Sequence, residues 1–99
     1  MSPAEVIAAA IGKRLKLTLV YDGHARVVEP HTFGVDKHGR EILCGYQTAG
    51  TSTSGKPVGW KFFLVAKICE LRTTADRFAS PRPRYQHNDG AFLRIIAQL

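Results

Sequence analysis

The chain has 99 residues, of which 44% are hydrophobic and 22% charged, and its formal net charge is +6. A chain of this length and ordinary globular composition forms one domain around a single core, which excludes disordered, collagen-like and coiled-coil proteins. Its sequence pI of about 9.8 favours anionic partners such as nucleic acid, nucleotides or an acidic protein surface. A generically basic soluble protein without such a partner is the alternative.

The cysteine pattern and the hydropathy point to the cytoplasm. Cys44 and Cys69 are the two cysteines, and both lie in apolar, strand-like segments, where they are expected to be core thiols and not part of a disulfide framework. No apolar run approaches the roughly 20 residues that cross a bilayer, and the N-terminus lacks the pattern of a signal peptide. We therefore expect a cytoplasmic protein with no membrane partner.

The N-terminus carries the signals of a helix over residues 3–13. Ser2 is a favourable N-cap, Pro3 suits the first helical position, and Glu5 completes a capping box. Apolar residues then recur at helical spacing, and Gly12-Lys13 ends the pattern.

A period of two then predicts five short strands. They cover residues 15–21, 25–35, 41–49, 60–65 and 67–73, with turns at residues 22–23 and 37–40 and a loop at residues 50–58. Pro30, within the second strand, predicts a bend, a bulge or an edge. Because no helix separates the strands, a parallel α/β sheet is excluded. We expect a mainly β fold, a small, strongly bent, five-stranded antiparallel barrel of the Sm or SH3 type over residues 15–74.

Residues 75–99 are predicted to wrap over this barrel. The run SPRPRY at residues 80–85 is extended, because each proline biases the preceding residue away from the α region. Asp89-Gly90 can cap a short C-terminal helix, since Phe92, Ile95 and Ile96 follow at helical spacing. A terminal strand is the alternative.

Four segments between residues 15 and 72 stand out by their order and spacing: LVYDG at 19–23, RVVEP at 26–30, LCGY at 43–46 and KFFLVAKI at 61–68. In this order they resemble the WYL domain, an Sm-like barrel found mostly in bacterial transcriptional regulators. The last segment is similar to the family's Arg-x-Phe-x3-Arg-Ile type of stretch, with lysine in both basic places. The Trp-Tyr-Leu triplet that names the family falls on Glu41-Ile42-Leu43, which keeps only the leucine.

The resemblance implies a domain that senses nucleic-acid or nucleotide-like ligands and regulates a protein. The winged helix and the further domain that usually flank the family's barrel are not expected here. A divergent, stand-alone member would act in trans on a separate regulated protein, or as a homo-oligomer. The resemblance also places a ligand-facing basic residue at Arg26.

Basic and aromatic residues alternate in the fourth strand. There Lys61, Phe63 and Val65 share one face, while the row that begins at Trp60 shares the other and is expected to be core. An aromatic ring beside cations is how single-stranded nucleic acid is held. The alternative is that both rows are buried or face another subunit, and the lysines only extend to water. The candidate ligand-binding residues are Arg26, Tyr46, Lys61, Phe63, Lys67, Arg82 and Arg84, the last two as phosphate contacts from the tail.

Two other patterns are rejected, and enzyme chemistry finds no support. Residues 50–56 match most of a phosphate-binding loop, but Pro57 replaces the metal-binding hydroxyl and a strand follows instead of a helix. His24, His31 and His38 recur every seven residues, yet odd spacing on strands sends them to opposite faces, which argues against a shared metal ion. No buried pair of carboxylates suggests acid–base catalysis. We expect neither a metal, nor a cofactor, nor an enzyme.

The sequence therefore predicts a non-catalytic regulatory domain whose basic and aromatic barrel face binds single-stranded nucleic acid or a phosphorylated nucleotide. A protein-interaction or oligomerisation module is the alternative, because small barrels expose strand edges that can pair with another chain.

Overall fold

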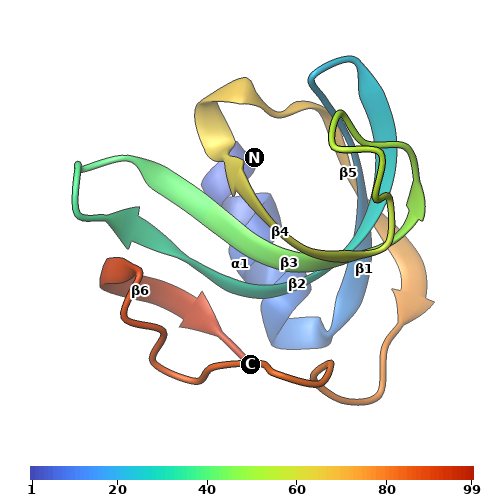
Figure 1. Ribbon diagram of the computed structural model, residues 1–99. Coiled ribbons are helices and arrows are strands. Elements are labelled where there is room, and N and C mark those ends of the chain that lie inside the picture. Colours follow the sequence, from blue (N-terminus) through green and yellow to red (C-terminus); the bar gives the residue numbers. More distant parts are fainter.

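The computed structural model describes all 99 residues and begins with α1, which covers Pro3–Lys13 (Figure 1). The capping box is confirmed: Ser2 Oγ accepts from the Glu5 N–H at 3.2 Å, and Glu5 Oε1 accepts from the Ser2 N–H at 3.1 Å. The helix ends at Arg14, whose left-handed φ of 54° turns the chain into the first strand. With 11 residues, α1 falls short of the length and apolar character that a membrane-crossing helix needs.

Six antiparallel strands form one bent sheet, so the expected number of five is too low. They are β1 (Leu15–Tyr21), β2 (His24–Asp36), β3 (Glu41–Gly50), β4 (Gly59–Leu64), β5 (Cys69–Arg77) and β6 (Phe92–Gln98), with a 3-10 turn η1 (Val65–Lys67) before β5. The order is β4-β3-β2-β1-β5, and β6 pairs with β2. Because β4 and β5 do not pair with each other, the sheet does not close into the expected barrel.

The long strand β2 organises the sheet by changing partners at its middle. Its first half pairs with β1, as in Val28 with Leu17, and its second half pairs with β6, as in Thr32 with Gln98. The register against β3 shifts between Pro30 and Thr32, an irregularity of the kind expected at Pro30. The two partners of β2 thus occupy successive stretches of the same edge.

The expected C-terminal helix is replaced by β6, the strand alternative. Beyond Pro30, β2 no longer has β1 beside it, so its backbone groups need another partner. β6 supplies that partner and lies along β2 in Figure 1. Pairing with this open edge therefore determines the structure of residues 92–98 more strongly than the helical spacing of Phe92, Ile95 and Ile96.

The main core lies between α1 and the inner face of the sheet, which is the face toward the helix. Ile7, Ala10 and Ile11 of the helix pack on the sheet residues Leu17, Leu19, Val28, Phe33, Leu43, Phe63 and Val65. Phe63 is 1% exposed, whereas Phe62 is 52% exposed. The expected assignment of the two rows of β4 is therefore reversed, because Phe63 belongs to the main core and Phe62 does not.

Residues 78–91, here called the strap, connect β5 to β6 without helix or strand. They pass over the outer face of the sheet, the face turned away from α1. The Trp60 Nε1–H of β4 donates to the Pro83 carbonyl at 2.9 Å, and the Trp60 indole stacks on the Tyr85 ring at 6.5 Å. A smaller apolar cluster of Ile42, Cys44 and Phe92 lies on this side of the molecule.

Candidate ligand-binding site

Arg26 is a buried cation without a carboxylate partner. It lies on β2 shortly after the β1–β2 turn, and only 5% of its surface is exposed. Its Nη2–H donates to the Tyr21 carbonyl at 3.1 Å and its Nη1–H to Gln47 Oε1 at 3.3 Å, while Nε has no partner. The guanidinium carbon lies 5.5 Å from the centroids of the Tyr21 and Phe63 rings. No acid forms an ion pair with Arg26, and burial of such a charge costs several kcal/mol, as an order of magnitude.

Gln47 and Lys61 lie at the same end of the inner face as Arg26. Gln47 is fully buried and donates to the Thr51 carbonyl at 3.0 Å. Lys61 Nζ donates to the Lys56 carbonyl at 2.6 Å and to the hydroxyls of Ser52 and Ser54. We name Arg26, Gln47 and Lys61 the loop-end cluster, because Gln47 and Lys61 bind the loop that joins β3 to β4 and Arg26 binds Gln47. The cluster contains two cations and no acid.

The strand pairing explains why the cluster forms. Arg26 lies opposite Gly50, Gln47 opposite Gly59, and Lys61 opposite Gly45, so β2, β3 and β4 contribute one polar side chain each. Gly50, with a φ of 103°, lets the backbones approach closely, since a Cβ there would lie 2.2 Å from the Ala25 carbonyl oxygen. The loop returns into strand β4 and not into a helix, which agrees with the rejection of a phosphate-binding loop motif.

Arg82 and Tyr46 meet on the outer face, away from the loop-end cluster. The Arg82 guanidinium donates to both oxygens of Glu29, at 2.7 and 3.0 Å, and its carbon lies 4.8 Å from the Tyr46 ring centroid. Lys16 adds a second cation 3.6 Å from Glu29. Burial pushes the pKa of Glu29 up, but the hydrogen bonds and charge of Arg82, together with the charge of Lys16, outweigh burial and hold it below its usual value. Arg82 is thus already paired with a carboxylate.

His31 lies beneath the strap and is fully buried. Its Nδ1 lies 2.8 Å from the Glu29 carbonyl oxygen and its Nε2 accepts from the Arg82 N–H at 3.1 Å, which assigns the neutral tautomer with hydrogen on Nδ1. Burial lowers the pKa of His31, and the hydrogen bond to Glu29 and its charge oppose this shift only in part. The Phe78 ring stacks on the imidazole. His31 therefore fixes the strap to the sheet.

The other predicted site residues are dispersed. Phe63 is core and reaches the loop-end cluster only through its contact with Arg26. Lys67 is exposed on η1 and lines a separate hollow of about 540 Å³ with Pro3 and Arg40. Arg84 is exposed on the strap, where its φ is 71°. Of the predicted set, Arg26 contacts Phe63, Lys61 shares the row of Phe63 on β4, Tyr46 joins Arg82, and Lys67 stands apart.

The cysteines and histidines form no metal centre. No three His, Cys, Asp or Glu side chains gather in a way that could hold a metal ion. Cys44 is buried, and burial raises the pKa of its thiol to about 12. Cys69 is exposed, which corrects the expectation that both are core thiols.

Several residues of these two sites are not predicted from the sequence. Gln47 could have been detected in the sequence, because it is a polar residue in the inner row of β3, which it shares with Leu43 and where an apolar residue is expected. Glu29 has no such signal, since its surroundings depend on the strap. The chain matches no protein-family model, no curated protein and no solved structure. The resemblance to the WYL domain remains a prediction from the four sequence segments.

Proposed function

We propose that the protein is a non-catalytic binding domain that holds the phosphate of a nucleotide-like ligand at the loop-end cluster. The observation that carries the proposal is Arg26, which is 5% exposed and has no carboxylate partner and a free Nε. A buried, uncompensated cation is costly. A phosphate would offset this cost and would occupy the free donor.

The chemistry of the cluster suits phosphate better than a metal or a neutral ligand. The planar guanidinium fork of Arg26 matches two oxygens of a phosphate. Lys61 adds a second positive charge, and the hydroxyls of Ser52 and Ser54, which it contacts, can turn to donate hydrogen bonds to an anion. Binding requires the loop to move, because it binds Lys61 directly and also binds Gln47, the partner of Arg26.

The depth of Arg26 favours a nucleotide over a polymer at this cluster. Single-stranded nucleic acid also presents phosphates, but an internal phosphodiester would have to enter with nucleotides on both sides. A terminal phosphate reaches a buried guanidinium more easily. We propose that loop movement upon binding is the signal passed to a separate regulated protein, as the family resemblance implies.

The test is thermal unfolding with inorganic phosphate, pyrophosphate and a panel of nucleoside phosphates, at low and at high salt. A ligand at about 100 times its Kd stabilises the native state by about 2.7 kcal/mol. We expect Arg26→Met to abolish this stabilisation, whereas Arg72→Met, which changes an exposed arginine of β5, should retain it. Without ligand, Arg26→Met should lower the free energy of unfolding by less than the roughly 3–5 kcal/mol that is lost when one partner of a buried ion pair is removed.

Two results would contradict the proposal. One is the absence of any stabilising member of the panel at low salt. The other is an Arg26→Met variant that responds to the best ligand as the unchanged protein does.

An assembly module is the second candidate function, and β6 is the feature that favours it. β6 pairs only with β2, so its other edge is open, and it exposes 71% of Leu93 and 44% of Ile96. In contrast, β5 carries Glu70, Arg72, Asp76 and Arg77, and charges on an edge strand discourage pairing.

A further inference from the structure

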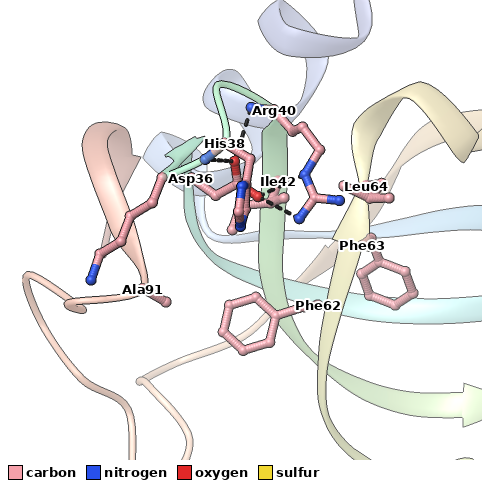
Figure 2. A pocket seen from close by; sticks show the side chains of 9 residues that line it. Asp36, His38, Arg40, Ile42, Phe62, Phe63, Leu64 and Ala91 are labelled. Carbon is pink, nitrogen blue, oxygen red and sulfur yellow. Dashed lines mark hydrogen bonds and ion pairs between the residues drawn. The ribbon is translucent and has the colours of Figure 1, made fainter.

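Phe62 is an exposed aromatic ring that the loop-end cluster does not explain. It is the one aromatic residue among the large apolar side chains that are exposed, with 52% of its surface open to solvent. Phe92, which is buried, lies behind it with a centroid separation of 6.4 Å. Phe62 and Phe63 leave β4 in opposite directions, as Figure 2 shows, so the exposed ring lies on the outer face. A supported ring with one open side is suited to stacking.

Two hollows flank this ring. The first, of about 400 Å³, is drawn in Figure 2 and is lined by Phe62, Ala91 and the basic β2–β3 turn with Lys37, His38 and Arg40. The second, of about 350 Å³, has Phe62 and Ala91 on its wall too, together with Trp60, Tyr85, Arg84, Gln86 and Asp89. Phe62 therefore forms part of the wall of both hollows. Each has the size of a small ligand pocket.

Each hollow has one cation that forms no ion pair. In the first, Asp36 binds Arg40 through two contacts of 2.9 Å, which leaves Lys37 without an ion pair. Hydrogen bonds from the backbone N–H groups of Arg40 and His38 and from the Arg40 side chain, together with the charge of Arg40, outweigh burial and lower the pKa of Asp36. In the second hollow, Arg84 forms no ion pair, and Asp89 on the same wall accepts a hydrogen bond from the Ala91 N–H. An anionic chain that crosses Phe62 would meet a free cation on either side.

We infer that this outer surface is a binding site for single-stranded nucleic acid, with a base stacked on Phe62 and phosphates contacted by Lys37 and Arg84. Aromatic rings beside cations bind unpaired bases with little sequence preference. A duplex hides its base faces and would bind less well. The site is separate from the loop-end cluster, so it does not depend on the proposed nucleotide function.

The test uses the fluorescence of Trp60, the single tryptophan of the chain, which lines the second hollow. The protein is titrated at low salt with a single-stranded oligothymidylate of about eight nucleotides, a length within the range of small binding domains. We expect saturable quenching, and weakening of about 5- to 150-fold in Phe62→Ala from the loss of one stacked base. Leu93→Ala, which removes an exposed apolar side chain outside both hollows, should bind normally. Thermal unfolding confirms that both variants fold.

Two further variants assign the remaining contacts. Arg84→Ala should reduce the slope of log K against log salt by about 0.7, as expected for one lost phosphate contact on a single strand. Arg72→Met, which changes an exposed arginine outside both hollows, should leave oligonucleotide binding unchanged. The inference is overturned by equal binding of Phe62→Ala and Leu93→Ala, by a duplex that binds as tightly, or by a polyphosphate or acidic peptide that displaces the oligonucleotide at equal charge concentration.

Discussion

Glu29 and Arg26 are both buried ionisable residues of β2, yet only Glu29 has partners of opposite charge. Glu29 is 2% exposed and binds Arg82 through two hydrogen bonds, with Lys16 nearby. Arg26 has hydrogen bonds to neutral oxygens and contacts with two rings. The pairing of Glu29 fixes the strap, and the lack of such pairing at Arg26 is what favours a ligand there.

His31 makes stability depend on pH. Burial lowers its folded pKa below the ordinary value of 6.5, so the unfolded chain takes up the proton first as the pH falls. The stability from neutral His31 is therefore fully present above about pH 6.5 and declines below it. The physical reason is that a proton on Nε2 removes the acceptor for the Arg82 N–H.

We expect the free energy of unfolding, measured with urea, to fall between about pH 7.5 and about pH 5.5 in the unchanged protein. His31→Gln should be less stable at the higher pH and lose less stability across the same interval. An equal loss in both proteins would show that other groups cause the pH dependence.

At the scale of elements, β2 and β6 approach each other closely at Gly34. A Cβ on Gly34 would lie 2.1 Å from the Arg94 carbonyl oxygen and 3.0 Å from the Ile95 Cα, and backbone cannot yield as a flexible side chain does. The absence of a side chain at Gly34 therefore allows β6 to pair with the second half of β2.

Gly34→Ala should consequently destabilise the protein by about 1–3 kcal/mol, the usual cost of overpacking. Gly12→Ala is the matched control, because nothing lies within 4 Å of its added Cβ and the position is helical, where alanine is favoured by up to about 1 kcal/mol. Urea unfolding measures both variants, and amide hydrogen exchange should show the loss of protection in β6. Full protection of β6 in Gly34→Ala would contradict this account.

At the scale of the whole molecule, local signals in the sequence are sufficient to predict most of the helices and strands. The capping box of Ser2 and Glu5 predicts α1, period-two alternation predicts β1 to β5, and Pro30 predicts the bend. β6 is different, because its partner is the open edge of β2, about 60 residues earlier in the chain. Its own residues fit a helix or a strand.

The candidate site is predictable to a smaller extent, for the same reason. Alternation in β4 separates Lys61 and Phe63 from Trp60 and Phe62, but only the tertiary position of the main core decides which row is buried. Arg82 is expected to contact phosphate, yet it binds Glu29, which lies 53 residues away in the sequence. Arg26 and Lys61 can be proposed from the sequence, while Gln47, which links Arg26 to the loop, requires the strand register.

At this scale the remaining question is whether the protein only binds ligands or also assembles through an open strand edge. If the second candidate function holds, a symmetric dimer forms by pairing of β6 with β6, which would cover Leu93 and Ile96. We then expect light scattering to report a dimer at high concentration and a monomer for Ile96→Lys, since a buried lysine without a partner opposes association. Thr73→Lys, an equivalent change at an exposed position of β5, should leave the dimer intact. A monomer at every concentration would exclude assembly through β6 and leave both binding sites unaffected, because neither includes a residue of this strand's exposed edge.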